Sequence, residues 1–202
     1  MKVILKFLVS ISLIAFVATA YAEVAPDLLV KQTAQEVLTI IKNDKEIQAG
    51  NKQKLYAVIE TNILPNFDFD RVCRMVLGKS WRSATPEQQA TFQKEFQSLL
   101  LRTYASALGK YKDQTMEYKP FRLEADAKNA NVKTQILQSG GQPVEVDYDL
   151  IKSENGWKVY DIVIESVSLV TNYRSQFSSE IRQNGLDSLN KKLEEKNRLA
   201  GV

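Results

Sequence analysis

The segment 157–164, which reads W-K-V-Y-D-I-V-I, constrains the fold most because, apart from Asp161, its run from Val159 to Ile164 is apolar or aromatic on both faces. Alternate residues of a strand point to opposite sides, so Trp157, Val159 and Val163 share one face and Tyr160 and the isoleucines share the other. A strand of this kind must be covered by apolar material on both sides. In a small domain, a ligand could supply one of these two layers.

The chain before this strand is predicted to be helical from about 24 to 111. Apolar residues at steps of three and four predict helices over 26–41, 52–64, 69–77 and 86–111. The last of these begins with Thr85, Pro86 and Gln88, which form a capping box around a proline at the first helical position. It would extend about 39 Å, so its apolar stripe needs a large partner. We expect the following sheet to supply that partner.

Period-two alternation predicts strands over 131–138, 143–152 and 157–164, with two strand fragments at 115–118 and 121–124 separated by Pro120. Turn residues at 139–142, which include Gly140 and Gly141, and at 153–156 join these strands as an antiparallel meander. Two closing helices are expected at about 169–183 and 186–197, with Gly185 between them. Helices, then strands, then helices predict an α+β fold, in which N-terminal helices and the long helix pack on the sheet.

Residues 1–22 have the pattern of a cleaved secretory signal peptide: Lys2 and Lys6, an apolar core, and Ala20-Tyr21-Ala22 before the expected cleavage point. The mature chain, 23–202, is predicted to be one domain with a helical lobe at about 24–111, a sheet lobe at about 115–166 and closing helices at about 169–197. Removing Lys2 and Lys6 from the 27 basic residues leaves 25, against 24 acidic residues. A mature net charge of +1 with interspersed signs does not indicate nucleic-acid binding.

The absence of histidine excludes histidine-dependent nucleophilic sites and the common zinc sites. The single cysteine, Cys73, has no intramolecular disulfide partner and is expected to be a small buried residue. The sequence contains no phosphate-binding loop, dinucleotide fingerprint or EF-hand loop. We therefore predict a binding protein without catalytic residues, metal site or cofactor.

An ordered set of motifs runs through the chain after residue 22. Each motif is weakly diagnostic alone, but the set resembles the MlaC family, also called the toluene-tolerance auxiliary family. One departure is visible, because the family pattern has glycine where this chain has Ser166. The motifs are Val76-Leu77-Gly78-x-x-Trp81-Arg82-Ser83-Ala84-Thr85-Pro86-Glu87-Gln88, then Phe92, Phe96, Leu100 and Thr103-Tyr104-Ala105, then Trp157-Lys158-Val159-Tyr160-Asp161, and Glu165-x-Val167-Ser168-Leu169-Val170-x-Asn172-Tyr173-Arg174-x-x-Phe177.

The resemblance implies a soluble periplasmic phospholipid carrier of Gram-negative bacteria. Such a carrier moves lipid between an outer-membrane lipoprotein-porin complex and an inner-membrane ABC transporter complex with an MCE-domain protein, and it maintains outer-membrane lipid asymmetry. The family holds the acyl chains in an apolar pocket between sheet and helices, with the head group near solvent. Phospholipid is then the cargo, and no catalysis is involved.

Given such a pocket, we predict a set of lipid-contacting residues on the long helix, the last two long strands and the segment after them. The alternative for each of them is ordinary core packing, because periodicity does not distinguish a pocket wall from a filled interior. The set is Phe96, Leu100, Tyr104, Val144, Val146, Tyr148, Ile162, Ile164, Val167, Leu169 and Val170.

Four further residues, Trp81, Arg82, Tyr173 and Arg174, are candidates for contact with a head group or a partner protein, since arginine pairs well with phosphate. Asp161 interrupts an apolar strand, and a buried carboxylate needs a partner, so we expect it to be a structural anchor. Two other functions stay open: a small hydrolase or isomerase with a carboxylate site at Asp161 and Tyr160, and an envelope adaptor without a ligand.

Overall fold

A computed structural model describes residues 23–109, 114–138 and 140–200. The expected signal peptide, the expected helix end at Tyr111 and the turn residue Ser139 lie outside these ranges. In chain order the elements are α1 (Pro26–Asn43), α2 (Lys45–Gln48), α3 (Lys52–Asn62), the 3₁₀ turn η1 (Leu64–Asn66), α4 (Phe69–Leu77), α5 (Lys79–Ser83), α6 (Pro86–Gly109), β1 (Thr115–Tyr118), β2 (Asn129–Leu137), β3 (Val144–Ser153), β4 (Gly156–Ile164), β5 (Val167–Ser168) and α7 (Leu169–Leu199).

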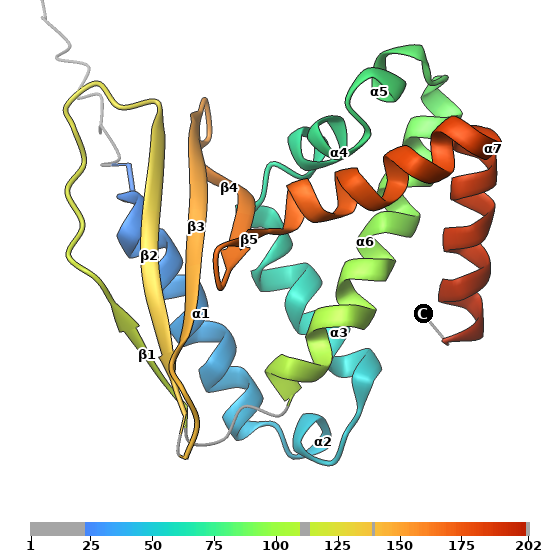
Figure 1. Ribbon diagram of the computed structural model, residues 1–202. Coiled ribbons are helices and arrows are strands. Elements are labelled where there is room, and N and C mark those ends of the chain that lie inside the picture. Colours follow the sequence, from blue (N-terminus) through green and yellow to red (C-terminus); the bar gives the residue numbers. More distant parts are fainter. Residues whose placement is uncertain (1–22, 110–113, 139, 201–202) are drawn as a thin grey trace, which may run out of the picture.

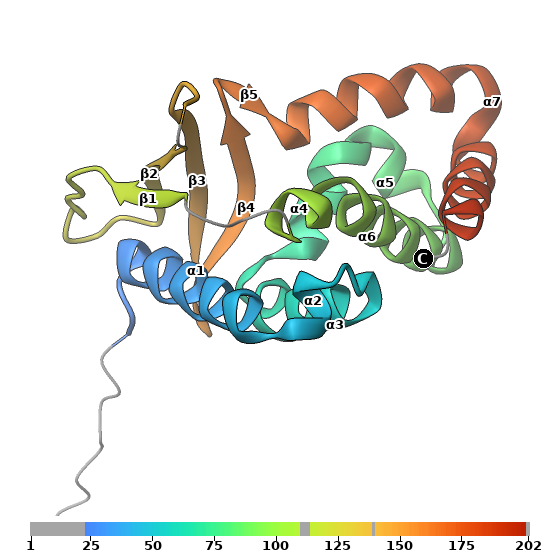
Figure 2. The same cartoon turned by 90° about the horizontal axis from the view of Figure 1, so that it is seen from below.

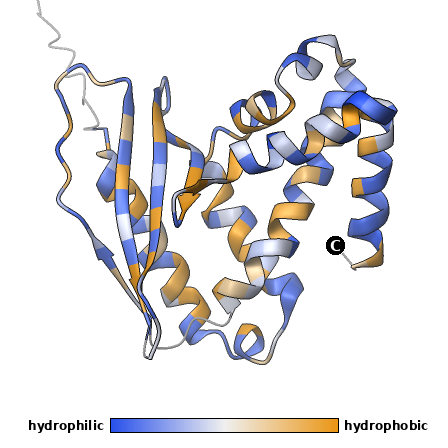
Figure 3. Cartoon of the chain, viewed as in Figure 1, coloured by the Kyte–Doolittle hydropathy of each residue, from blue (hydrophilic) through white to orange (hydrophobic). Residues whose placement is uncertain are grey.

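The strands form one antiparallel sheet in the order β1-β2-β3-β4-β5, which confirms the predicted meander and the α+β class. Figures 1 and 2 show the sheet at one side of the molecule, with α1 along one face and α4, α6 and α7 beyond the edge formed by β4 and β5. Hydrophobic and hydrophilic bands alternate along β2 and β3 (Figure 3), as the strand period requires.

Local signals placed most helix ends correctly. The capping box at the start of α6 is formed, because the Thr85 amide donates to Gln88 Oε1 at 3.0 Å and the Gln88 amide donates to Thr85 Oγ1 at 3.2 Å. Gly185 interrupts α7 with φ 80° and ψ 170°, a conformation available only to glycine, so α7 consists of two helical segments as predicted.

Four short elements were not predicted, and one predicted strand is wrong. Helices α2 and α5, the 3₁₀ turn η1 and strand β5 have only two to five residues, which is too short to show a period. Residues 121–124 form no strand and belong to the loop between β1 and β2. Pro120 removes a backbone donor at the start of this segment, and three of its four residues are solvent-exposed.

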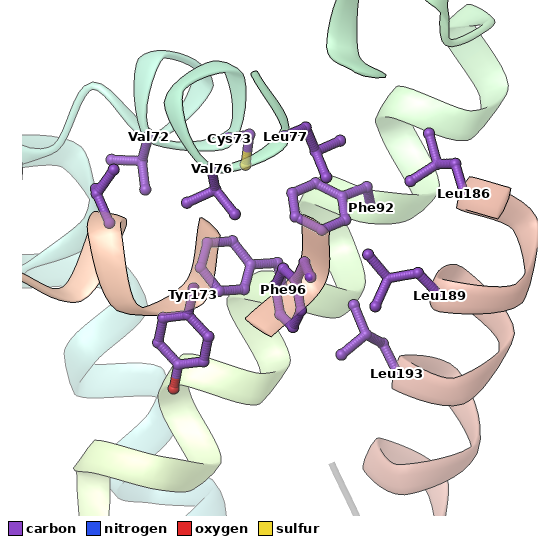
Figure 4. Packing of buried hydrophobic residues seen from close by; sticks show 12 residues of the cluster. Val72, Cys73, Val76, Leu77, Phe92, Phe96, Tyr173, Leu186, Leu189 and Leu193 are labelled. Atoms are coloured by element: carbon purple, nitrogen blue, oxygen red, sulfur yellow. The ribbon is translucent and has the colours of Figure 1, made fainter. Parts of the chain in front are cut away.

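The long helix α6 finds its buried partners among helices rather than on the sheet, which corrects the expected pairing. One side of α6 packs with α4 and α7 in the cluster of Figure 4, and the other packs with α1, α2 and α3. The buried sheet residues instead form a third cluster with Val30 of α1. The amphipathic period of α6 shows that its stripe is buried but does not identify the surface that covers it.

Candidate functional site

The strand pairing gathers the predicted strand residues on one face of the sheet, here called the inner face. Cross-strand pairs share a face, so each row of partners can be read from the register. The four rows are Ile136–Val144, Thr134–Val146–Ile164, Val132–Tyr148–Ile162 and Ala130–Leu150–Val159. The five residues of β3 and β4 predicted to contact lipid therefore stand on this one face, and Val167 of β5 joins them because it pairs with Ile164. The expected division of β4 into two faces is therefore wrong at its start. A register shift between Asp149 and Leu150 skips Tyr160 in the pairing, so Trp157 and Val159 share the face of Ile162 and Ile164.

Burial changes along the inner face. At one end, Leu150, Trp157 and Val159 are fully buried against Val30 of α1. Toward the other end, Val144, Ile162 and Ile164 are only half-buried. The inner face therefore has a solid end, which is ordinary core, and an end where large apolar side chains keep accessible surface.

Tyr148 lies between these two ends. Burial, and then the neighbouring Tyr118, raise the pKa of Tyr148 to about 12, so its hydroxyl is neutral at physiological pH, and the hydroxyl hydrogen-bonds with Thr134. Thr134 in turn donates to the Val146 carbonyl at 2.7 Å. This chain of bonds satisfies the polar groups on an otherwise apolar surface.

The helical candidates divide into two groups. Phe96 is 1% exposed, and its ring centroid lies between 5.1 and 6.0 Å from those of Tyr173, Phe92, Phe177 and Phe69. Val170 belongs to the same cluster. Leu100 and Tyr104 are half-buried at its margin. The structure therefore places Phe96 and Val170 inside packed core and leaves Leu100 and Tyr104 with accessible surface.

A pair of tyrosine hydroxyls marks the edge of this cluster. The Tyr173 hydroxyl points away from the hydrophobic residues in Figure 4. It hydrogen-bonds with Tyr104, and burial, followed by this bond, raises the pKa of Tyr104 well above its usual value. Burial similarly raises the pKa of the Cys73 thiol, which fits an unreactive core residue.

The remaining candidates, Val167 and Leu169, directly follow the turn between β4 and β5. Glu165 and Ser166 adopt φ of 47° and 65°, which lie in the left-handed region that favours glycine. Ser166, which stands where the family pattern has glycine, therefore keeps a backbone conformation typical of glycine. Val167 follows with 54% of its surface exposed, whereas Leu169 is half-buried. Strand β5 thus presents an apolar side chain beside the accessible end of the inner face.

Asp161 is a structural anchor, as expected. Its Oδ1 accepts the Val170 amide at 3.1 Å and the Ile162 amide at 2.9 Å, and its Oδ2 accepts the Ser168 hydroxyl. These bonds tie the start of α7 to β4. A carboxylate committed to capping a helix is not free to act as a general base, so the geometry gives no support to a catalytic site at Asp161 and Tyr160.

Of the four candidates for head-group or partner contact, Arg174 lies against Gly78, which is three residues before Trp81, although some ninety residues separate the two segments in sequence. Trp81 and Tyr173 pack on the same cluster. The Arg174 Nη2 atom lies 3.4 Å from the position that a Cβ on Gly78 would occupy. Arg82 is exposed one residue beyond Trp81. Neither the composition nor the helical period indicated this juxtaposition.

Alternation along β2 could have identified two further inner-face residues, Thr134 and Ile136, which share rows with Val146 and Val144. Two surface hollows lie elsewhere and contain none of the predicted lipid-contact residues. The first, of about 360 Å³, is lined by Gly50, Asn51, Lys52, Gln53, Tyr56 and Ala200. The second, of about 300 Å³, is lined by Pro120, Phe121, Arg122, Leu123, Glu124, Ala127, Asn129, Ala130, Asn131 and Lys133.

Among the described residues, no helix has the length and hydrophobicity needed to cross a membrane. Between residues 23 and 200, apart from the gaps noted above, no group of three or more cysteine, aspartate and glutamate side chains could hold a metal ion.

Comparisons with known proteins agree with this fold and these motifs. The toluene tolerance protein ttg2D of Pseudomonas putida is 28% identical over 176 residues, which is 87% of this chain and 81% of that protein. The intermembrane phospholipid transport system binding protein MlaC of Haemophilus influenzae is 26% identical over 180 residues, 88% of this chain and 84% of that protein.

A solved structure is also similar: the phospholipid-binding protein of Ralstonia solanacearum in complex with a phospholipid. It is 39% identical with a TM-score of 0.83, and the match covers 89% of this chain and 100% of that one. The sequence model of the MlaC protein family matches residues 31–195, which include every element from the middle of α1 to the last helical segment. The chain therefore belongs to the MlaC family.

Proposed function

We propose that this protein is a phospholipid carrier that holds acyl chains against the inner face of the sheet. The observation that carries the proposal is the similarity to the Ralstonia solanacearum protein, which binds a phospholipid and shares the fold at 39% identity. The accessible end of the inner face supports it from this chain's own residues, because several large apolar side chains gather there without complete burial.

The contact surface of this proposal uses the half-buried candidates: Leu100 and Tyr104 of α6, Val144 and Tyr148 of β3, Ile162 and Ile164 of β4, and Leu169 of α7, with the more buried Val146 between them. Val167 would contribute from the adjoining strand β5. Phe96 and Val170 would act behind this surface, by holding α6 and α7 together.

The energetics favour an apolar pocket over a polar one. Two acyl chains carry about 30 methylenes, and exposing them to water costs about 0.8 kcal/mol each, or roughly 24 kcal/mol in all. A carrier must cover most of that surface, yet it must release the lipid again. Aliphatic and aromatic side chains resemble the hydrocarbon of a bilayer. The lipid therefore has a similar free energy in the carrier and in the membrane, and it can be exchanged in either direction.

In this proposal the carrier works in the periplasm of a Gram-negative bacterium after cleavage of residues 1–22. It moves phospholipid between the inner-membrane ABC transporter complex with its MCE-domain protein and the outer-membrane lipoprotein-porin complex, which maintains lipid asymmetry. The name of the Haemophilus influenzae relative, an intermembrane phospholipid transport system binding protein, supports this role. No catalytic step is included.

The test is to purify the full chain after export and to identify bound lipid by solvent extraction and native mass spectrometry. We expect one or more phospholipids on the wild-type protein and none on an Ile164→Asp variant. Val163→Asp is the matched control, because Val163 is adjacent on β4 but faces the opposite side of the sheet. Circular dichroism checks that both variants fold.

The wild-type result separates the alternatives. A lipid-free wild-type protein that still assembles with envelope complexes would favour the adaptor, and turnover of an added lipid would favour the enzyme. Undiminished lipid on the Ile164→Asp variant would contradict the placement of the pocket on the inner face.

A further inference from the structure

Three cations surround Gly78 and form what is here called the basic patch: Lys79 and Arg82 of α5, and Arg174 of α7. Lys79 and Arg82 are three residues apart on α5, so they lie on neighbouring positions of the helix surface. Arg174 joins them from α7, since its guanidinium packs over Gly78. All three side chains are exposed.

The charges of the basic patch are available to a partner, unlike those of the preceding helix. In α4, Arg71 pairs with Asp68 at 3.1 Å and Arg74 pairs with Asp70. No ion pair connects Lys79, Arg82 or Arg174 to an acidic side chain within the part of the chain that the structure describes. The three charges of the basic patch are therefore not taken up by salt bridges among the described residues, although the mature chain as a whole carries only +1.

The backbone fixes the position of this charge. Gly78 has φ 55° and ψ −118°, which breaks the chain between α4 and α5. Trp81 then packs against the α4–α6–α7 cluster and holds α5 in place. Figure 1 shows α5 at the periphery of the helical part, away from the sheet.

We propose that the basic patch docks the protein on the surface of an anionic phospholipid bilayer, through the lipid phosphates. Arginine donates two parallel hydrogen bonds to a phosphate, and lysine adds a point charge. Such docking would bring a carrier close to the membrane with which it exchanges lipid. The inference does not depend on where the acyl chains bind.

The test measures co-sedimentation of the full mature protein with vesicles of phosphatidylglycerol and phosphatidylcholine at 50 mM salt. Each basic residue near an anionic surface strengthens binding by about fivefold. We therefore expect the triple variant Lys79→Gln, Arg82→Gln, Arg174→Gln to bind roughly 100-fold more weakly than wild type. Raising the salt to about 0.5 M should weaken wild-type binding as well.

The control is the triple variant Lys191→Gln, Lys196→Gln, Arg198→Gln, which removes the same charge from exposed positions of the last helical segment. We expect it to bind within a few-fold of wild type. Equal loss in both variants, equal binding to pure phosphatidylcholine vesicles, or no binding of wild type to anionic vesicles would overturn the proposal; the last result would point to an acidic protein surface instead. Bound lipid, measured separately on the patch variant, should be unchanged, so the two proposals can fail independently.

Discussion

Replacing Phe96 by alanine distinguishes packed core from pocket wall. Phe96 is 1% exposed and contacts four aromatic rings from α4, α6 and α7. Deleting a buried phenylalanine ring costs about 3–5 kcal/mol, and the upper part of that range applies because the aromatic contacts add to simple burial. For a chain of this size, each kcal/mol lowers the melting temperature by about 2–4 °C. We therefore expect a decrease of about 10 °C or more.

The assays are urea unfolding monitored by circular dichroism and lipid extraction from the same preparation. Phe96→Ala should lose stability while its folded fraction keeps bound lipid. Leu100→Ala, one helical turn later and half-buried, should lose less stability, about 1–2 kcal/mol, and more lipid. A Phe96→Ala protein that unfolds within 1 kcal/mol of wild type but has lost its lipid would refute this division of α6, because Phe96 would then be pocket wall.

Two further measurements test individual residues. Gly185→Ala should destabilise the protein by about 1–3 kcal/mol, because φ 80° and ψ 170° exclude a Cβ-bearing residue while nothing within 4 Å would contact the new methyl group; an unchanged urea midpoint would show that α7 bends elsewhere. Tyr148→Phe tests the neutral hydroxyl. The folded-state pKa of Tyr148 is raised from 10.0 to about 12, so its contribution to stability is complete below pH 10 and is lost as the pH rises toward 12. The stability difference between wild type and Tyr148→Phe should therefore shrink across this window, by at most about 2.7 kcal/mol, and a constant difference would argue against burial of the hydroxyl.

Local patterns predicted the parts of the fold that depend on near neighbours in sequence. Thr85, Pro86 and Gln88 marked the start of α6 because a capping box involves residues only three apart. Gly185 marked the break in α7 because its conformation excludes other residues. The turns around Gly140 and Gly156 fixed the meander, since tight turns force consecutive strands to pair. These signals are carried by adjacent residues and need no tertiary contacts.

Local signals could not show which elements cover α6. They also could not show which residues of its apolar stripe are packed core and which keep accessible surface. Phe96 and Leu100 are equivalent in the helical period, yet one lies within an aromatic cluster and the other at its margin. The exposed Val167 likewise shares the apolar character of buried Val170. Hydrophobicity determines that a side chain favours burial, whereas the surrounding elements determine what buries it.

By itself, the sequence determined the long helices and strands, the α+β class and the resemblance to the MlaC family, because these follow from local spacing and ordered motifs. Only the tertiary structure decided that Asp161 caps α7, that one face of the sheet ends in accessible apolar residues, and that Arg174 joins Lys79 and Arg82 around Gly78. The physical reason is the same in each case: the interacting groups come from distant segments, and their distances are set by packing of whole elements rather than by any nearby residue.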